Sequence, residues 1–156
     1  MQNGQHRLPI LFLPEFLGAK NWTMIPFRTL SGRWSARSNR RARKTISGIL
    51  AAAEAQVHGC SVDETHFHEV GDGQAILNTL LICCTVSYLH PDCIVATPVQ
   101  TGCGQVECAH GLMDIPAPAT AAILATGVPT TEEKLEGELC TPTSAAIIKH
   151  FVQEFV

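Results

Sequence analysis

Apolar side chains recur with helical spacing in the middle of the 156-residue chain, and the pattern predicts a helix over about 40–58. Its apolar positions fall at i, i+3, i+4, i+7 and i+11, on one face: Ile46, Ile49, Leu50, Ala53 and Val57. Asn39 is the expected cap at its start, and Gly59 stands where a helix end favours positive φ. We therefore expect one side of this helix to lie against a core.

A second stretch, residues 75–89, is apolar nearly all round and too long for a strand, so it predicts a buried helix. Shorter apolar segments at 93–99 and 105–108 predict extended pieces. Two further helices are expected, over about 118–126 and about 142–154. Helices that alternate with short strands indicate an α/β or α+β fold in a single domain.

Residues 1–38 show no clean period, and we interpret them as a poorly specified basic leader ahead of an α/β domain over 39–156. Residues 1–44 hold nine of the chain's 11 Lys and Arg residues and only one of its 14 Asp and Glu residues, so the remainder is acidic. A basic segment with two tryptophans is consistent with a nucleic-acid-binding arm. A solvated extension without a partner is the alternative.

The seven cysteines include no C-x-x-C pair and do not resemble a disulfide framework, which favours a reducing compartment and hence the cytoplasm. Cys83 and Cys84 lie within an apolar run and are expected to be small core residues. No uninterrupted apolar stretch reaches the roughly 18 residues that a membrane-spanning helix needs. The first residues also lack the pattern of a signal peptide, so we expect no membrane segment.

Histidines with a spacing suited to metal binding follow the first predicted helix. His66 and His68 are two residues apart, so in an extended backbone both imidazoles project to the same side. Glu69 comes next, and His110 lies further along the chain. Imidazole suits nickel, zinc, copper or iron, so these four residues are candidate ligands of one transition-metal ion. The alternative is that they hydrogen-bond to backbone and hold a loop.

The start of the last predicted helix is a candidate anion site. Thr141 is its expected cap, Pro142 occupies the first helical position, and Thr143 and Ser144 add two hydroxyls. Unpaired N–H groups and the helix dipole favour a phosphate at such a position. Thr141, Thr143 and Ser144 are therefore candidate binding residues, with ordinary helix capping as the alternative.

Five short motifs occur in an order that resembles the LarC family of nickel insertion proteins, over about residues 42–156. They are Val57-His58-Gly59, HFHEVG at 66–71, AHG at 109–111, PAPAT at 116–120 and EGELCTPT at 136–143. The resemblance implies the insertion of nickel into pyridinium-3,5-bisthiocarboxylic acid mononucleotide, forming nickel–sulfur and nickel–carbon bonds. It also implies CTP hydrolysis with Mg or Mn, which is lyase-class cyclometallase chemistry.

The resemblance implies roles for the candidate residues as well. His66, His68 and His110 would hold or pass nickel, and the Thr141 to Ser144 segment would bind the phosphate of the nucleotide-like substrate. The CTP-binding part of the family is expected on a separate C-terminal half. Whether the chain forms a homo-oligomer stays open.

Three positions depart from the family's pattern. Gln74 and Asn78 stand where the family has acidic residues after HFHEVG, and Ser144 replaces the glycine of TPTG. A nonenzymatic metal-binding protein or a degenerate structural remnant of the family is therefore an alternative. A nucleic-acid-binding module that uses the basic leader is a second alternative.

Overall fold

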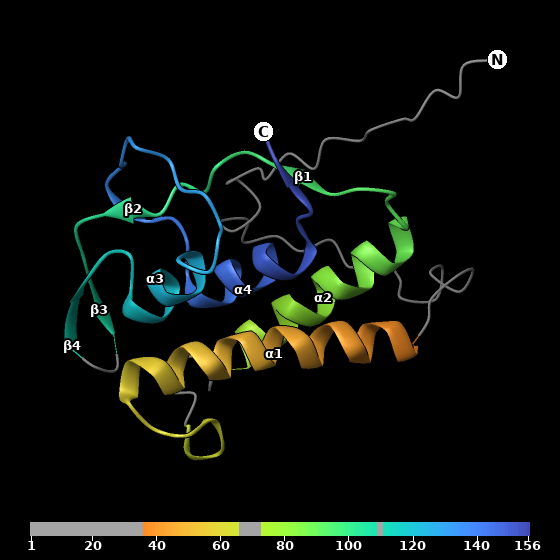
Figure 1. The fold of residues 1–156 in the computed structure, drawn as a ribbon, viewed down its shortest axis with the longest axis horizontal. Helices are drawn as coiled ribbons and strands as arrows, with labels where there is room; N and C mark the ends of the chain where they lie inside the picture. The colour runs from red at the N-terminus through yellow and green to blue at the C-terminus, as the bar shows by residue number, and fades with distance from the viewer. Residues whose placement is uncertain (1–35, 66–72, 109–110) are drawn as a thin grey trace.

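The computed structural model of the chain describes residues 36–65, 73–108 and 111–156, and Figure 1 shows how their elements are arranged. Helices account for most of the regular backbone. They are α1 (Ala36–His58), the short 3-10 helix η3 (Val62–Glu64), α2 (Gln74–Leu89), α3 (Pro118–Leu124) and α4 (Pro142–Phe151). Among these residues, no helix combines the length and the apolar character needed to cross a bilayer.

The strands are short and pair two by two. β1 (Val95–Ala96) runs parallel to β6 (Glu154–Phe155), and β2 (Gly102–Cys103) runs antiparallel to β5 (Gly137–Glu138). β3 (Gln105–Cys108) and β4 (Gly111–Asp114) form an antiparallel pair. The mixture confirms the predicted α/β or α+β class. Two-stranded sheets of this size cannot form a layer, so the helices build the core.

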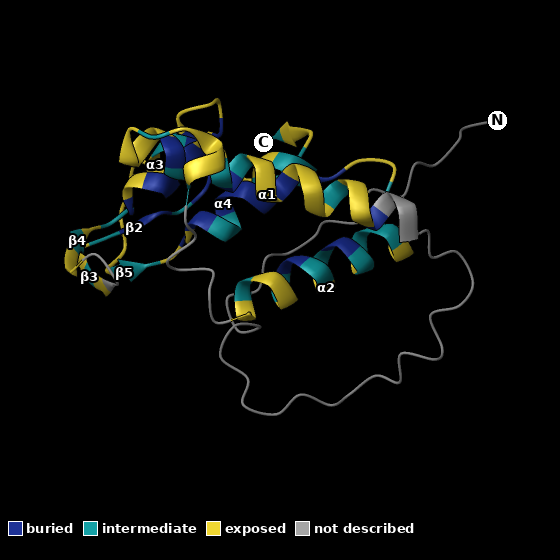
Figure 2. Cartoon of the chain, turned by 90° about the horizontal axis from the view of Figure 1, so that it is seen from below, coloured by how far each residue is buried: buried dark blue, intermediate teal, exposed yellow. Residues whose placement is uncertain are grey.

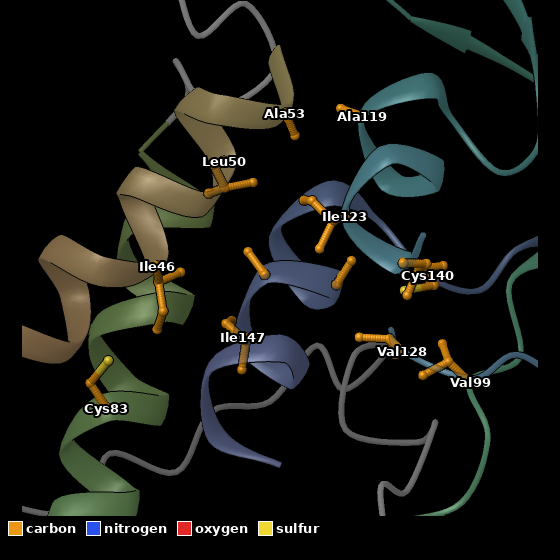
Figure 3. Packing of buried hydrophobic residues seen from close by; sticks show 13 residues of the cluster. Ile46, Leu50, Ala53, Cys83, Val99, Ala119, Ile123, Val128, Cys140 and Ile147 are labelled. Atoms are coloured by element: carbon orange, nitrogen blue, oxygen red, sulfur yellow. The ribbon is translucent and has the colours of Figure 1, made fainter. Parts of the chain in front are cut away.

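The core lies where α1, α3 and α4 meet, and Figure 3 shows their side chains converging there. Ile46, Leu50 and Ala53 of α1 are buried, as their spacing predicts, whereas Val57, predicted on the same face, is 41% exposed at the end of the helix. From α4, Ala145 and Ala146 have no exposed surface. Because both side chains are single methyl groups, α4 can lie close to its neighbours. Full burial of a side chain such as Ile46 stabilises the fold by about 1.5–3 kcal/mol.

The start of α1 differs from the prediction. The helix begins at Ala36, so Asn39 lies within it rather than at its cap. Asn39 is 4% exposed, and its Nδ2 donates a hydrogen bond to Cys84 Sγ at 3.6 Å. The side chain thus joins α1 to α2 instead of capping its own helix. The predicted end is confirmed, because Gly59 follows α1 with φ of 64°.

The helix predicted over 75–89 is confirmed, but the prediction that it is buried is wrong. Only Thr79 and Cys83 of α2 are buried, and Cys84 is half-buried. α2 packs mainly on α1 and only lightly on α4, so its other side faces away from the core. Figure 2 shows α2 at the margin of the helical core.

The last helix ends earlier than the predicted residue 154. α4 stops at Phe151, because the chain then extends to pair with β1. The side chain of Gln153 also joins this segment to the chain before β1, since its Oε1 accepts a hydrogen bond from Ile94 N at 2.6 Å. The strand predicted over 93–99 is correspondingly short, with Val99 adding an isolated bridge to Thr130.

Candidate functional site

A cavity of about 50 Å³ lies between α1, α2 and the start of α4. Its polar lining is Arg43, Ser47, Thr79 and Thr143, and its apolar lining is Leu50, Ala75 and Ile76. A single water needs a cavity of roughly 10–15 Å³, so this space accommodates a few waters or one phosphate-sized group. One guanidinium and the hydroxyls of Ser47 and Thr143 can donate hydrogen bonds into this space, which suits a small anion.

The first half of α1 supplies the positive charge. Arg43 and Ser47 are one turn apart and both line the cavity. Arg40 and Lys44 are exposed on neighbouring positions of the same face. The only acidic residue of α1 is Glu54, toward the other end of the helix, so no neighbouring carboxylate of α1 neutralises these cations. The charge of Arg43 also partly offsets the effect of burial, which raises the pKa of the Cys83 thiol on α2.

The start of α4 lies at the same cavity through Thr143. Thr141 caps the helix as predicted, because its Oγ1 accepts a hydrogen bond from Ser144 N at 3.3 Å. The hydroxyls of Thr141 and Ser144 are also 3.0 Å apart and bond to each other. These two residues therefore serve as an ordinary cap, whereas the half-buried Thr143 faces the cavity.

The start of α2 borders the cavity as well. Its N-cap, Gly73, has φ of 76° and no side chain that could accept from the first-turn amides. Ala75 and Ile76 of this turn line the cavity, and Thr79 Oγ1 donates to Ala75 O at 2.8 Å. Two positive helix ends and Arg43 therefore meet at one small space, an arrangement that favours a phosphate.

Sequence reasoning identified Thr143 but missed Arg43 and Ser47. Arg43 belongs to the basic run that ends at Lys44, and in the sequence this run is continuous with the positive charge of residues 1–38. The available signal was the i, i+4 spacing of Arg43 and Ser47 on the side of α1 next to its apolar face. Which loop or helix lies opposite that side is tertiary information that periodicity does not carry.

The predicted metal ligands His66, His68, Glu69 and His110 lie outside the described residues. Within the part of the chain that the structure describes, no three His, Cys, Asp or Glu side chains gather as a metal-binding group. The nickel site therefore stays a prediction.

The amides at two of the positions that depart from the family's pattern bond to each other. Gln74 Nε2 donates a hydrogen bond to Asn78 Oδ1 at 2.9 Å, one turn along α2. Two carboxylates at this spacing would repel each other, whereas the two amides form a neutral pair. The first turns of α2 thus carry no negative charge that would oppose an anion in the cavity.

The buried cysteines are unreactive. Burial raises the pKa of the Cys140 thiol to about 11, and Glu138 adds to the effect. Burial also raises the pKa of Cys83. Both thiols are protonated near neutral pH, so neither is a thiolate ligand or nucleophile. The prediction of a core role is confirmed for Cys83.

Comparison with known proteins gives a consistent result. A family model described as "Nickel insertion protein" matches residues 22–156, which extends the range indicated by the motifs toward the start of the chain. Nothing among the solved structures matches this chain significantly.

Several curated relatives carry the name "Pyridinium-3,5-bisthiocarboxylic acid mononucleotide nickel insertion protein". The Geobacillus kaustophilus protein is 42% identical over 110 residues, which are 70% of this chain and 26% of that protein. The Clostridium kluyveri protein is 45% identical over 106 residues, 68% and 26% of the two chains. The Staphylococcus epidermidis protein is 40% identical over 132 residues, 85% and 32% of the two chains. The matched part thus spans about a quarter to a third of these relatives.

Proposed function

This chain belongs to the nickel insertion protein family, and we propose that it contributes to the insertion of nickel into pyridinium-3,5-bisthiocarboxylic acid mononucleotide. The observation that carries the proposal is the cavity lined by Arg43 and Thr143. A mononucleotide presents a phosphate monoester, which bears close to two negative charges near neutral pH. This is the chemistry that a guanidinium and two helix N-termini recognise.

In this proposal the phosphate enters the cavity and the pyridinium ring stays outside it. Arg43 donates from its guanidinium, and the hydroxyls of Ser47 and Thr143 donate to the remaining oxygens. Thr141 and Ser144 do not contact the phosphate in this proposal. Their capping hydrogen bonds fix the first turn of α4, which carries Thr143. The cavity has room for little more than the phosphate, so it positions the substrate without contacting the sulfur-bearing groups.

Nickel is the second substrate. We propose that His66, His68, Glu69 and His110 hold it, since imidazole and carboxylate groups form a suitable donor set. His68 precedes Gly73 by five residues in the chain, which at full extension span at most about 18 Å. Gly73 caps the end of α2 that borders the cavity. Chain connectivity alone therefore keeps His68 within reach of a nucleotide bound there.

The energy source and further partner of the reaction are proposed from the family. We propose that CTP, with Mg or Mn, binds to a separate C-terminal half, as the family resemblance implies. We propose that the combined lyase-class reaction takes place in the cytoplasm.

The test is a reconstituted insertion reaction. The chain is mixed with the mononucleotide, nickel, CTP and Mg, together with the remaining part of the Geobacillus relative, and the pincer product is measured by mass spectrometry. We expect product from the wild type and at least a tenfold loss in His68→Asn, because loss of even an outer-shell partner of a metal ligand typically costs about 10- to 100-fold. His90→Asn is the matched control, since His90 is exposed at the end of α2 and asparagine tolerates its positive φ.

A second candidate function is favoured by the amide pair of Gln74 and Asn78. If the carboxylates of the family are needed for the reaction, this chain is a nonenzymatic metal-binding remnant. Absence of product in the reconstituted reaction, together with nickel binding by the wild type, would support the remnant and contradict the enzymatic proposal.

A further inference from the structure

The outward side of α2 is apolar and has no partner among the described residues that buries it. Leu77, Leu81 and Tyr88 are 47%, 40% and 49% exposed, and their spacing of i, i+4 and i+11 places them on one side of the helix. None of the 16 residues of α2 is Asp, Glu, Lys or Arg. A helix without charge on any side is normally covered, and an exposed apolar stripe marks a docking surface.

The chain that precedes α1 begins beside this helix. The first turn of α1 is tied to the second half of α2 by the hydrogen bond from Asn39 to Cys84. Figure 1 shows the start of α1 and the end of α2 on the same side of the molecule. The 35 residues before Ala36 could extend over roughly 100 Å, whereas α2 is only about 24 Å long. Any part of this segment can therefore reach the exposed side of α2.

The composition of this preceding segment matches that surface. Residues 8–17 read LPILFLPEFL, with seven large apolar side chains and with Glu15 as their single charge. They also lie outside the family match, which begins at residue 22. We propose that residues 8–17 dock in cis on the side of α2 that bears Leu77, Leu81 and Tyr88. The apolar segment and the uncharged helix thereby cover each other.

Hydrogen exchange of the full chain, followed by mass spectrometry, tests this docking. In the wild type we expect amides of residues 8–17 to exchange at least tenfold more slowly than in an unfolded peptide. Leu81→Lys places a charge in the docking surface and is expected to abolish this protection. Leu112→Lys is the matched control, since Leu112 is 65% exposed on β4, and it is expected to leave the protection unchanged.

A second variant distinguishes loss of docking from unfolding of α2. Phe12→Lys leaves the helix intact and is expected to release residues 8–17 in the same way, with an unchanged circular dichroism spectrum. Full-rate exchange of residues 8–17 in the wild type, or protection that survives both variants, would overturn the proposal. Sedimentation as a dimer that Leu81→Lys dissociates, with residues 8–17 unprotected, would also overturn it and assign the surface to a second copy.

Discussion

Replacing Arg43 by glutamine is expected to weaken the binding of the pyridinium mononucleotide about 10- to 100-fold. The substitution keeps the length and polarity of the side chain but removes the cation that lines the cavity. A hydrogen bond to a charged group contributes about 1.5–3 kcal/mol, and each 1.4 kcal/mol is about tenfold in affinity. Calorimetric titration of the mononucleotide into the two proteins measures the difference.

Arg41→Gln is the matched control for this prediction. Arg41 is an exposed arginine on the same helix, two residues away, and it does not line the cavity. Its replacement is expected to change the affinity less than about twofold, because an exposed charge at a distance is screened by salt. Equal losses in both variants would indicate general attraction to the basic half of α1 rather than a phosphate site at Arg43.

Replacing Gly102 by alanine is expected to destabilise the fold by at least about 3 kcal/mol. Gly102 is buried in β2 with φ of 82°, where an L side chain is strained. A Cβ there would also overlap the carbonyl oxygen of Gly137 in the paired strand β5. Backbone strain of about 1–3 kcal/mol is thus added to a steric displacement of similar cost. Chemical denaturation measures the change in the free energy of unfolding.

Gly104→Ala separates the two contributions. Gly104 has φ of 101°, but a Cβ there would meet no atom within 4 Å. Its replacement incurs the backbone strain alone, so we expect a loss of about 1–2 kcal/mol. If Gly102→Ala lowered the free energy of unfolding no more than Gly104→Ala does, the close contact between β2 and β5 would be contradicted.

The sequence predicted the helices well where one face was clearly apolar. The spacing of Ile46, Leu50 and Ala53 predicted both α1 and its buried side, because those residues pack on α3 and α4. Asn39 shows where local rules fail. Its residue type favours a cap, but α1 begins three residues earlier, and the side chain bonds instead to Cys84, which is distant in sequence.

The helix α2 was predicted correctly, but its predicted burial was wrong for a different reason. Its apolar composition indicates that every side of the helix is buried, and the prediction assumed that the helices of the core bury all of them. The core buries it only around Thr79 and Cys83. Composition states how much surface a helix must bury, but it does not state what buries that surface. The docking of residues 8–17 is our account of the difference.

The candidate site was predicted in part. Thr141 was correctly predicted as a cap, and Thr143 lies at a cavity suited to a phosphate. Arg43 could not be assigned to this site from the sequence, because about a hundred residues separate it from Thr143 in the chain. Only the packing of α1 against α4 brings the two residues to one space.

The central claim is that the cavity at Arg43 and Thr143 recognises the phosphate of the substrate. Its most direct test is a calorimetric titration of the wild-type chain with the pyridinium mononucleotide and, separately, with the same compound after removal of its phosphate. We predict that the mononucleotide binds at least about tenfold more tightly, since charge-assisted hydrogen bonds to the phosphate are lost in the nucleoside. Equal affinities for the two compounds would contradict the account.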